Sequence, residues 1–471
     1  MFTQLRIQNF KSWADTGEFR MAPLTGFFGT NSSGKTAILQ FILMLKQTVE
    51  SSDRNRILHL GGDQYSYVDL GTTYDISHRH KLPEKIKFSF EWIPRNTHDH
   101  LFQIVTEVVI KEDKNFKFIA NKFTSSLKFE SKINVDNDQI NLEYFKYSFK
   151  ASDNQWNHIA INSQIRNDIG TIYTLSTDGI FLENWLAFEA SNFSDFTNIF
   201  NQLVNNYNIQ QVPVMASSLV IFNLENLAFS YTGLFENTYY LAPLRDYPKR
   251  TYLWSGERPQ DVGKRGELTV AALLASRKTN LEVETLVAKA LKDLGLIYGF
   301  RLNRITPKRG DYEILVKRSP NSAEVLITDV GFGVSQVLPI LVLCYYAPKG
   351  ATLIFEQPEI HLHPSVQAGL ADIFIDVIKT RNIQIIIESH SEHLLRRLQR
   401  RIAEEKDGFT NDDAALYFCK MNDQGDSELV PLEIDTYGNI CNYPDGFFGD
   451  EMGDLVAMTE ASIKRKMNVG A

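Results

Sequence analysis

The spacing of apolar and polar positions changes along the chain, and a glycine-containing loop lies at the first change. Residues 5–10 alternate as a strand does, residues 18–21 are a candidate partner strand, and residues 24–28 form a short apolar run. After the loop, apolar side chains recur at helical spacing over residues 37–49. This pattern predicts a strand, a glycine loop and a helix in that order.

From residue 85 to about residue 161, the pattern is that of strands separated by Asp, Asn, Lys and Gly. The candidate strands are residues 86–92, 102–110, 116–129 and 142–149. Together they predict an antiparallel β extension. Residues 182–236 hold helix-like stretches rich in Asn and Phe without a chemical motif, so we interpret them as an inserted helical arm.

Strand and helix patterns alternate again in the carboxyl half of the chain. Strands are expected at residues 312–316, 325–328, 352–355 and 384–388. Helices are expected at residues 336–346 and 367–379. Because strands that alternate with helices are typical of parallel sheets, the pattern predicts an α/β fold with a largely parallel sheet.

Composition narrows the class of protein without naming a function. At 471 residues with 43% hydrophobic content, the chain can bury one large core or two medium ones. Its formal net charge of -8 argues against a uniformly basic surface but leaves nucleic-acid binding open.

Cysteine usage and the apolar runs bear on where the protein works. Cys344, Cys419 and Cys441 have no paired spacing, so we expect neither a disulfide framework nor a zinc motif. A reducing, cytoplasmic location is therefore expected. The amino terminus lacks the features of a secretory signal. The longest apolar run, residues 337–347, is too short to cross a bilayer and is interpreted as a buried core helix, so no membrane partner is expected.

The glycine loop Gly29-Thr-Asn-Ser-Ser-Gly-Lys-Thr36 satisfies the pattern G-x-x-x-x-G-K-[ST]. In such loops, backbone N–H groups line the phosphates, the lysine adds a positive charge and the threonine hydroxyl reaches Mg²⁺. ATP and Mg²⁺ are therefore the predicted ligands, against the alternative of an unliganded glycine turn. The residues expected to hold them are Gly29, Asn31, Ser32, Ser33, Gly34, Lys35 and Thr36.

A second polar cluster follows the apolar strand at residues 352–355. Glu356 is expected to bind the metal ion, because carboxylates at a strand end can meet both metal and water beside the γ-phosphate. Gln357 occupies the next position, where an amide can orient a water molecule but cannot accept its proton. Hydrolysis is therefore expected to be slow, or Glu359 supplies the base. The alternative is a strand end whose acids cap the next turn.

Two further segments are candidates for contact with the phosphates. His390 follows the strand at residues 384–388 and is a candidate sensor of the γ-phosphate, with a structural histidine as the alternative. The turn at residues 329–336 opens a helix, so its N–H groups, with Gly333 and Ser335, are candidates to receive the nucleotide of a second subunit.

The histidines near these segments permit a second interpretation. Imidazoles at alternate or neighbouring positions are common metal ligands, so a metal cluster is an alternative to a dimer-contact loop. The side chains concerned are His361, His363, His390 and His393.

Taken together, the motifs resemble those of the ATPase heads of the SMC, RecF and OLD group, a branch of the ABC superfamily that includes AAA15-type ATPases. In the resemblance, residues 29–36 correspond to the Walker A loop, residues 329–336 to the signature, Glu356 to the Walker B acid and His390 to the switch histidine. The signature lacks a plain Leu-Ser-Gly-Gly-Gln, and Gln357 stands where a second acid is usual.

Other segments look like a prokaryotic subfamily that carries an uncharacterised carboxyl-terminal domain. These segments are residues 68–71, 240–245, 388–395 and 442–448. The resemblance implies a P-loop NTPase head of the ABC type, divided by its insertions. The expected divisions are the two head parts at residues 1–84 and 237–405, a β extension at 85–180, a helical insertion at 181–236 and a carboxyl-terminal subdomain at 406–471.

The resemblance also implies heads that form at least a dimer when nucleotide binds, and relatives encoded beside nuclease or toxin genes in anti-phage defence loci. The leading hypothesis is an ATPase that controls such a partner effector. One alternative is a RecF-like repair ATPase that binds DNA, and another is a scaffold that holds ATP without appreciable hydrolysis. The basic residues available to a DNA groove are Lys11, Lys264, Arg265, Arg396, Arg397, Arg400 and Arg401.

Overall fold

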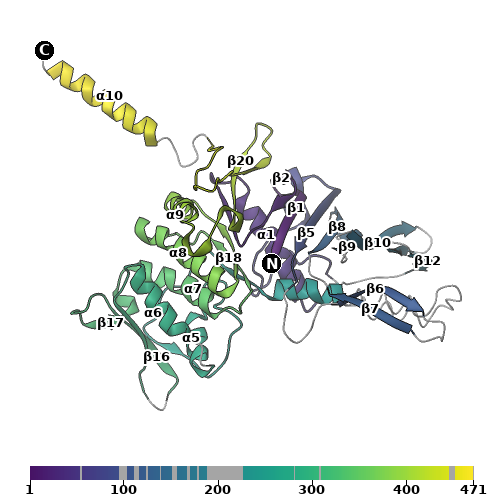
Figure 1. Cartoon of the computed structure of the whole chain (residues 1–471), viewed down its shortest axis with the longest axis horizontal. Helices are drawn as coiled ribbons and strands as arrows, with labels where there is room; N and C mark the ends of the chain where they lie inside the picture. The colour runs from purple at the N-terminus through teal and green to yellow at the C-terminus, as the bar shows by residue number, and fades with distance from the viewer. Residues whose placement is uncertain are drawn as a thin grey trace.

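The protein is described here from a computed structural model. The structure describes residues 1–53, 56–94, 103–110, 116–122, 126–137, 139–150, 156–166, 170–177, 180–187, 226–279, 282–306, 309–444 and 451–469. Its strands form two large sheets, which lie beside each other in Figure 1, together with smaller ones.

A six-stranded sheet carries the strands that lead into the predicted motifs. Its order is β13 (Thr238–Leu241), β18 (Thr352–Glu356), β19 (Gln384–Glu388), β4 (Leu24–Gly29), β20 (Ala414–Met421) and β21 (Ser427–Pro431). Neighbouring strands are parallel except for β21, which pairs antiparallel with β20. The predicted parallel sheet is confirmed, and the chain segments that build it are far apart in sequence.

Both faces of this sheet are buried, which is why its strands are continuous apolar runs rather than alternating ones. Along β18, Leu353 and Phe355 join one hydrophobic cluster, whereas Ile354 joins the other. Since successive side chains of a strand point to opposite faces, the sheet separates two cores. The helices of the structure are α1 (Lys35–Glu50), α2 (Thr73–Ile76), α5 (Thr269–Lys278), α6 (Val283–Asp293), α7 (Phe332–Tyr346), α8 (Pro364–Arg381), α9 (Glu392–Ala403), α10 (Glu451–Val469) and the helical residues 226–236.

The helix α7 is the buried core helix that the longest apolar run predicts. Its residues from Val334 to Tyr346 are all buried, and it packs against α5, α6 and β18. The helix begins at Phe332, earlier than the predicted start at residue 336, because the glycine-rich first turn has low helix propensity and hides the start. Among the described residues, no helix combines the length and the apolar character that crossing a membrane requires.

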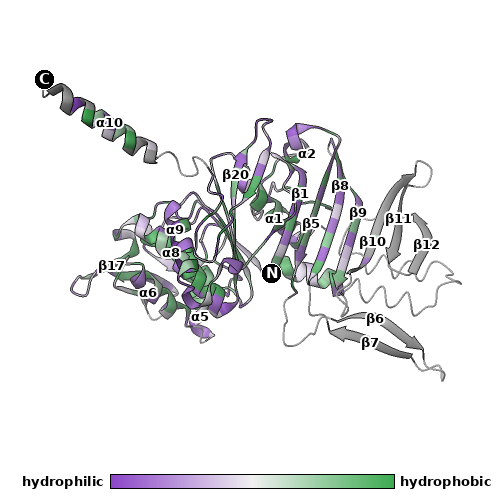
Figure 2. Ribbon diagram, turned by 45° about the horizontal axis from the view of Figure 1, so that its top comes forward, coloured by the Kyte–Doolittle hydropathy of each residue, from purple (hydrophilic) through white to green (hydrophobic). Residues whose placement is uncertain are grey.

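The second large sheet is antiparallel and has nine strands. Its order is β12 (Ile180–Ala187), β11 (Gly170–Thr177), β10 (Trp156–Arg166), β9 (Gln139–Lys150), β8 (Leu127–Asp136), β5 (Glu84–Trp92), β1 (Phe2–Phe10) and β2 (Trp13–Asp15), with β3 (Phe19–Arg20) also on β1. The predicted β extension and the predicted pairing of residues 18–21 with the first strand are confirmed. Figure 2 shows hydrophobic and hydrophilic residues alternating along β5 and β8, as expected for a sheet with one buried face.

The β extension differs from the prediction at its strand boundaries. The single strand predicted over residues 116–129 is wrong: β7 (Phe116–Lys122) pairs with β6 (Gln103–Ile110), whereas β8 pairs with β5 and β9. Strand partners are a tertiary property, so local pattern does not reveal where one strand ends and the next begins.

The segment expected to be a helical arm is partly a strand. β12 runs to Ala187, residues 226–236 are helical, and residues 188–225 lie outside the described part of the chain. A small sheet covers one end of the molecule and consists of β14 (Tyr252–Leu253), β16 (Asp311–Lys317), β15 (Gly299–Arg304) and β17 (Glu324–Leu326). The strand predicted at residues 325–328 ends at Leu326 and passes into a 3-10 turn.

Candidate nucleotide site

Three of the four predicted motifs meet at one edge of the six-stranded sheet. β4, β18 and β19 are parallel neighbours, so the glycine loop, Glu356 and Glu388 leave the sheet at the same edge. Glu356 and Glu388 are direct register partners on β18 and β19. Ligands of open α/β sheets bind at the carboxyl edge, and this edge carries the candidate site.

The glycine loop has a backbone that requires glycine at defined positions. Gly29 has φ 133° and Gly34 has φ 91°, both in the left-handed half of conformational space. A Cβ atom on Gly29 would lie 2.1 Å from the carbonyl oxygen of Cys419, and one on Gly34 would lie 2.3 Å from Ser427 Oγ. Thus β20 and the hairpin that follows it pack directly against the loop. In the predicted divisions, these contacts come from the carboxyl-terminal subdomain.

Exchanging Gly29 for alanine should unfold the loop and lower the unfolding temperature. The backbone carbonyl of Cys419 cannot move far, because it belongs to β20 beside β4. We therefore expect Gly29→Ala to lower the free energy of unfolding by more than about 1–3 kcal/mol, which is the cost of a strained backbone alone. Gly62→Ala is the matched control, since Gly62 has φ 94° but nothing within 4 Å of its added Cβ. Equal thermal denaturation curves for the two variants would contradict this account of the loop.

Lys35 and Thr36 begin α1 and point into the loop and toward β19. Lys35 Nζ donates to the carbonyl oxygens of Gly29 at 3.1 Å and Thr30 at 2.6 Å. Burial lowers the pKa of this lysine, while the charge of Glu388 raises it. The lysine is therefore held inside the loop that is predicted to bind the phosphates.

A set of oxygen ligands suited to Mg²⁺ lies beside Lys35. Thr36 Oγ1 donates to Glu388 Oε1 at 2.9 Å, and Tyr240 donates to Glu356 Oε2 at 2.5 Å. Burial raises the pKa of Glu356, and the neighbouring charge of Glu388 raises it further. A cation stabilises neighbouring carboxylates in their charged form, and Mg²⁺ binds one or two carboxylates together with phosphate oxygens and waters. Thr36, Glu356 and Glu388 fit that role.

Glu388 and Tyr240 are site residues that sequence reasoning did not identify. Glu388 is the last residue of β19 and is 1% exposed, so by pattern it was only the end of a buried strand. The signal that could have found it is a carboxylate at the end of an otherwise apolar parallel strand. In the described part of the chain, no group of three or more His, Cys, Asp or Glu side chains could hold a metal ion, so the alternative histidine cluster does not form.

Glu359 and His390 are joined by a hydrogen bond that links two of the predicted segments. The backbone N–H of His390 donates to Glu359 Oε1 at 2.6 Å, and burial raises the pKa of Glu359. Burial and then the charge of Lys35 lower the pKa of His390, which favours the neutral imidazole at pH 7. Gln357 has φ 44°, and its N–H donates to the Glu388 carbonyl at 2.8 Å. The loops after β18 and β19 therefore hold each other in place.

The predicted signature turn lies at the start of α7 and at the molecular surface. Gly331 caps the helix and Gly333 is in its first turn, whereas the Ser335 hydroxyl donates inward to the Phe332 carbonyl at 2.7 Å. The ring of Phe332 lies between those of Tyr247 and His361, with centroids 5.6 and 5.3 Å away. We call Tyr247, Phe332 and His361 the aromatic patch.

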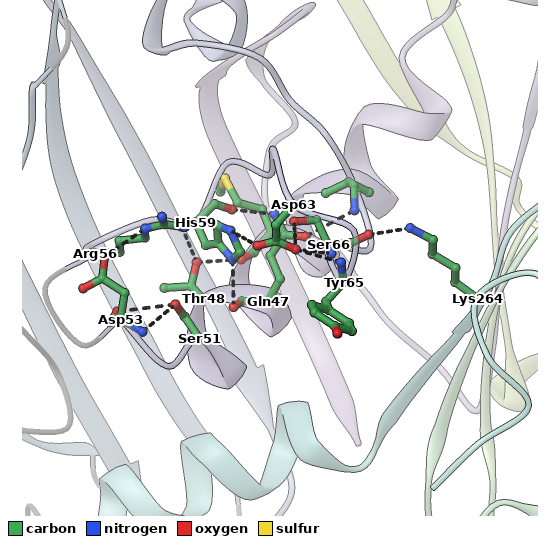
Figure 3. A network of polar contacts seen from close by, with 12 residues as sticks. Gln47, Thr48, Ser51, Asp53, Arg56, His59, Asp63, Tyr65, Ser66 and Lys264 are labelled. Carbon is green, nitrogen blue, oxygen red and sulfur yellow. Dashed lines mark hydrogen bonds and ion pairs between the residues drawn. The ribbon is translucent and has the colours of Figure 1, made fainter. Parts of the chain in front are cut away.

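A network of polar contacts fixes the far end of α1, as Figure 3 shows. Gln47 Nε2 donates to the His59 carbonyl at 2.5 Å, and Gln47 Oε1 accepts from the Val68 N–H at 3.2 Å. Lys264 Nζ donates to the Ser66 carbonyl at 2.9 Å and connects the same loop to the segment between β14 and α5. The helix that presents Lys35 and Thr36 is thus held at both ends.

The basic residues considered for a DNA groove are engaged within the chain. Besides Lys264, Lys11 Nζ donates to Gln40 at 2.6 Å, and Arg265 pairs with Asp246 at 3.1 Å. The arginines of α9 pair with acids on α8, on α9 and at its carboxyl end: Arg396 with Glu392, Arg397 and Arg401 with Asp372, and Arg400 with Glu404. Their arrangement is that of a solvated helix face with its own counter-charges.

Two protein-family models match the chain. A family model described as "AAA domain, putative AbiEii toxin, Type IV TA system" matches residues 24–396. A second, described as "Protein of unknown function (DUF3696)", matches residues 409–458. None of the curated proteins compared with the chain matches it.

Solved structures of SMC heads are similar to the chain at low identity. One is an SMC head bound to the C-winged helix domain of ScpA, with 13% identity and a TM-score of 0.40, covering 92% of this chain and 98% of that one. Another is the SMC head domain from Thermotoga maritima, with 11% identity and a TM-score of 0.36, covering 92% and 99%. A third, derived from Pyrococcus furiosus and bound to the C-terminal domain of ScpA, has 12% identity and a TM-score of 0.38, covering 92% and 96%.

The sheet order, the glycine loop and the family match together confirm the predicted α/β fold of a P-loop ATPase head. The second match confirms the predicted carboxyl-terminal domain of unknown function. Because the first family model covers most of its length, the chain belongs to the family described as AAA domain, putative AbiEii toxin, Type IV TA system.

Proposed function

We propose that the chain is an Mg²⁺-dependent ATPase with slow turnover, whose heads associate around ATP and thereby control a separate effector protein. The proposal depends most on the meeting of the glycine loop, Thr36 and the two register-paired carboxylates at one sheet edge. Phosphates, metal ion and water have to converge in this way for phosphoryl transfer.

Slow turnover follows from the residue after Glu356. Gln357 cannot accept a proton from water, and Glu359 already accepts a hydrogen bond from the His390 backbone. The raised pKa of Glu359 would make it a better base near neutral pH than an ordinary glutamate. Glu359 remains the proposed base, with Gln357 orienting the water and His390 contacting the γ-phosphate.

Association of two heads is supported by the surface around the proposed signature turn. Phe332 is 38% exposed and Tyr247 is 76% exposed, and the aromatic patch borders the free N–H groups at the start of α7. Exposed aromatic residues beside an anion-binding helix start suit a partner that brings its own nucleotide. A second copy of this chain is such a partner, with Gly333 and Ser335 in the turn that meets its phosphates.

The effector is proposed from the family description and from the motifs of the chain. That description names a putative toxin and a type IV toxin–antitoxin system. The sequence carries no motif for a second chemistry, such as a nuclease. We therefore assign nucleotide-dependent control to this chain, and a nuclease or toxin activity in anti-phage defence to a protein encoded nearby. The internally paired arginines of α9 do not favour a DNA-binding repair function.

Light scattering should detect the association directly. With ATP and Mg²⁺ the mass should double for the wild type, whereas Lys35→Ala and Phe332→Asp should stay monomeric, because one lacks nucleotide and the other places a charge in the interface. Tyr437→Asp is the matched control, since Tyr437 is 77% exposed and lies outside the patch. If Phe332→Asp associates as the wild type does, the aromatic patch is not the interface.

A further inference from the structure

Arg245 lies at the nucleotide edge of the sheet and has no assigned role. It follows β13, the parallel neighbour of β18, so its segment leaves the sheet beside Glu356. Backbone hydrogen bonds hold the segment on both sides of Arg245: Ala242 N–H donates to Lys264 at 2.8 Å, and Asp246 N–H donates to Arg265 at 2.9 Å. The position of the arginine is therefore fixed by the fold.

The guanidinium of Arg245 is buried without an acceptor. The residue is 4% exposed, and Nε, Nη1 and Nη2 have no hydrogen-bond partner among the described residues. Burying a charged group with several unsatisfied donors is costly, and such groups are nearly always paired in native proteins. Burial lowers the pKa of Arg245 to about 10, so the side chain still carries its charge at neutral pH.

The two neighbours that act on the pKa of Arg245 do not hydrogen-bond to its guanidinium. Glu359, whose charge acts on Arg245, accepts the His390 N–H with Oε1, and its Oε2 has no hydrogen-bond partner among the described residues. Tyr240, the other neighbour that acts on its pKa, donates its hydroxyl to Glu356. A planar cation with five donors thus lies near Glu359 and Tyr240, in the segment after β13, the strand that pairs with β18. Guanidinium groups bind phosphoryl oxygens in pairs, with charge-assisted hydrogen bonds.

We infer that Arg245 binds a phosphoryl anion at the terminal end of the nucleotide, either the γ-phosphate of ATP or the phosphate ion released from it. This inference rests on the proposed nucleotide site. Through Glu359, which lies near Arg245 and holds the His390 backbone, the arginine also couples the presence of that phosphate to the loop after β19.

Calorimetric titration in Mg²⁺ tests the inference with three ligands: a non-hydrolysable ATP analogue, ADP, and inorganic phosphate added to the ADP-bound protein. Arg245→Gln should weaken the binding of the ATP analogue by about 10- to 100-fold, because a charge-assisted hydrogen bond contributes about 1.5–3 kcal/mol to binding. The binding of ADP should stay unchanged. Arg245→Lys should recover part of the loss. Arg381→Gln is the control, since Arg381 is half-buried and its Nε also has no hydrogen-bond partner among the described residues, but it lies at the opposite end of β18 and β19.

The ligands also separate the possible outcomes. If phosphate binds to the ADP-bound wild type and Arg245→Gln abolishes that binding, the released phosphate ion is a ligand of Arg245. If Arg245→Gln weakens only the binding of the ATP analogue, the ligand is the γ-phosphate. Retained ADP binding shows that the variant is folded. If Arg245→Gln leaves all affinities unchanged, or weakens ADP and the analogue equally, the inference is wrong and the arginine serves only as a counter-charge to Glu359. If the wild type binds neither nucleotide, the proposed function itself fails.

Discussion

Lys35→Ala should abolish measurable ATP binding while the protein remains folded. Lys35 Nζ lies in the glycine loop, within hydrogen-bond distance of the Gly29 and Thr30 carbonyls. In the proposed complex, the phosphates of ATP replace these carbonyls as acceptors of the lysine N–H groups. Losing its charge-assisted hydrogen bonds to two phosphates should weaken binding by at least about 100-fold. Calorimetric titration with ATP and Mg²⁺ measures the effect.

Stability provides the internal check on this variant. Burial lowers the pKa of Lys35, so burying its charge costs free energy that alanine removes, and this gain offsets the two hydrogen bonds to loop carbonyls that alanine loses. We therefore expect the unfolding temperature without nucleotide to stay close to that of the wild type. Lys289→Ala, on the exposed face of α6, is the control for the loss of a lysine. Unchanged ATP affinity in Lys35→Ala would show that the glycine loop is not the nucleotide site.

Gln357→Glu and Glu359→Gln should change the ATPase rate in opposite directions or by very different amounts. A general base contributes about 10²–10⁴-fold, so removing the working base lies well outside assay scatter. If Glu359 is the base, Glu359→Gln removes most of the activity. Glutamine keeps an oxygen that can accept the His390 N–H, so the loop is retained and only the charge is lost. Steady-state phosphate release measures both variants.

Gln357→Glu reports on the same step from the neighbouring position. A carboxylate there would lie beside Glu356 and Glu388, whose charges would raise its pKa and bring it closer to that of an effective base. The rate should stay similar or rise. If Glu359→Gln leaves the rate untouched while Gln357→Glu raises it strongly, Glu359 is not the base, and the protein is a slow ATPase that stays in its ATP state until a partner intervenes. Glu356→Gln, which should weaken Mg²⁺ binding in every case, is the control.

Local motifs made the glycine loop and the strands around it predictable. The strand at residues 384–388 has the bounds that its apolar run predicts, and the glycine loop lies between β4 and α1 as expected. These features depend on contiguous residues, so the spacing of residue types along the chain is enough to predict them. The start of α7 could not be predicted, because the glycines in its first turn have low helix propensity. The break between β7 and β8 could not be predicted either, because it depends on which strands pair with each of them.

The remaining site residues come together only in three dimensions. Tyr240 and Glu356 are 116 positions apart, and Thr36 and Glu388 are 352 apart, yet each pair is joined by a hydrogen bond. No spacing along the chain predicts such pairs; the parallel order of β13, β18, β19 and β4 creates them. Arg245 was visible only as part of a family-like segment, and its burial without an acceptor could not be inferred from sequence.

A cysteine cross-link between the glycine loop of one subunit and the signature turn of another tests the ATP-dependent head dimer most directly. Asn31→Cys and Gly331→Cys suit this purpose, because both positions are exposed and a Cβ on Gly331 meets nothing within 4 Å. The background should carry Cys441→Ser, since Cys441 is exposed whereas Cys344 and Cys419 are buried.

The two cysteine variants should be mixed with a short bis-maleimide, in ATP, in ADP and without nucleotide. The account predicts a cross-linked dimer of Asn31→Cys with Gly331→Cys that forms in ATP and Mg²⁺ and is absent when Lys35→Ala is added to the variant carrying Asn31→Cys. No cross-link in ATP, while the same proteins still bind ATP, or a cross-link that forms equally without nucleotide, would contradict it.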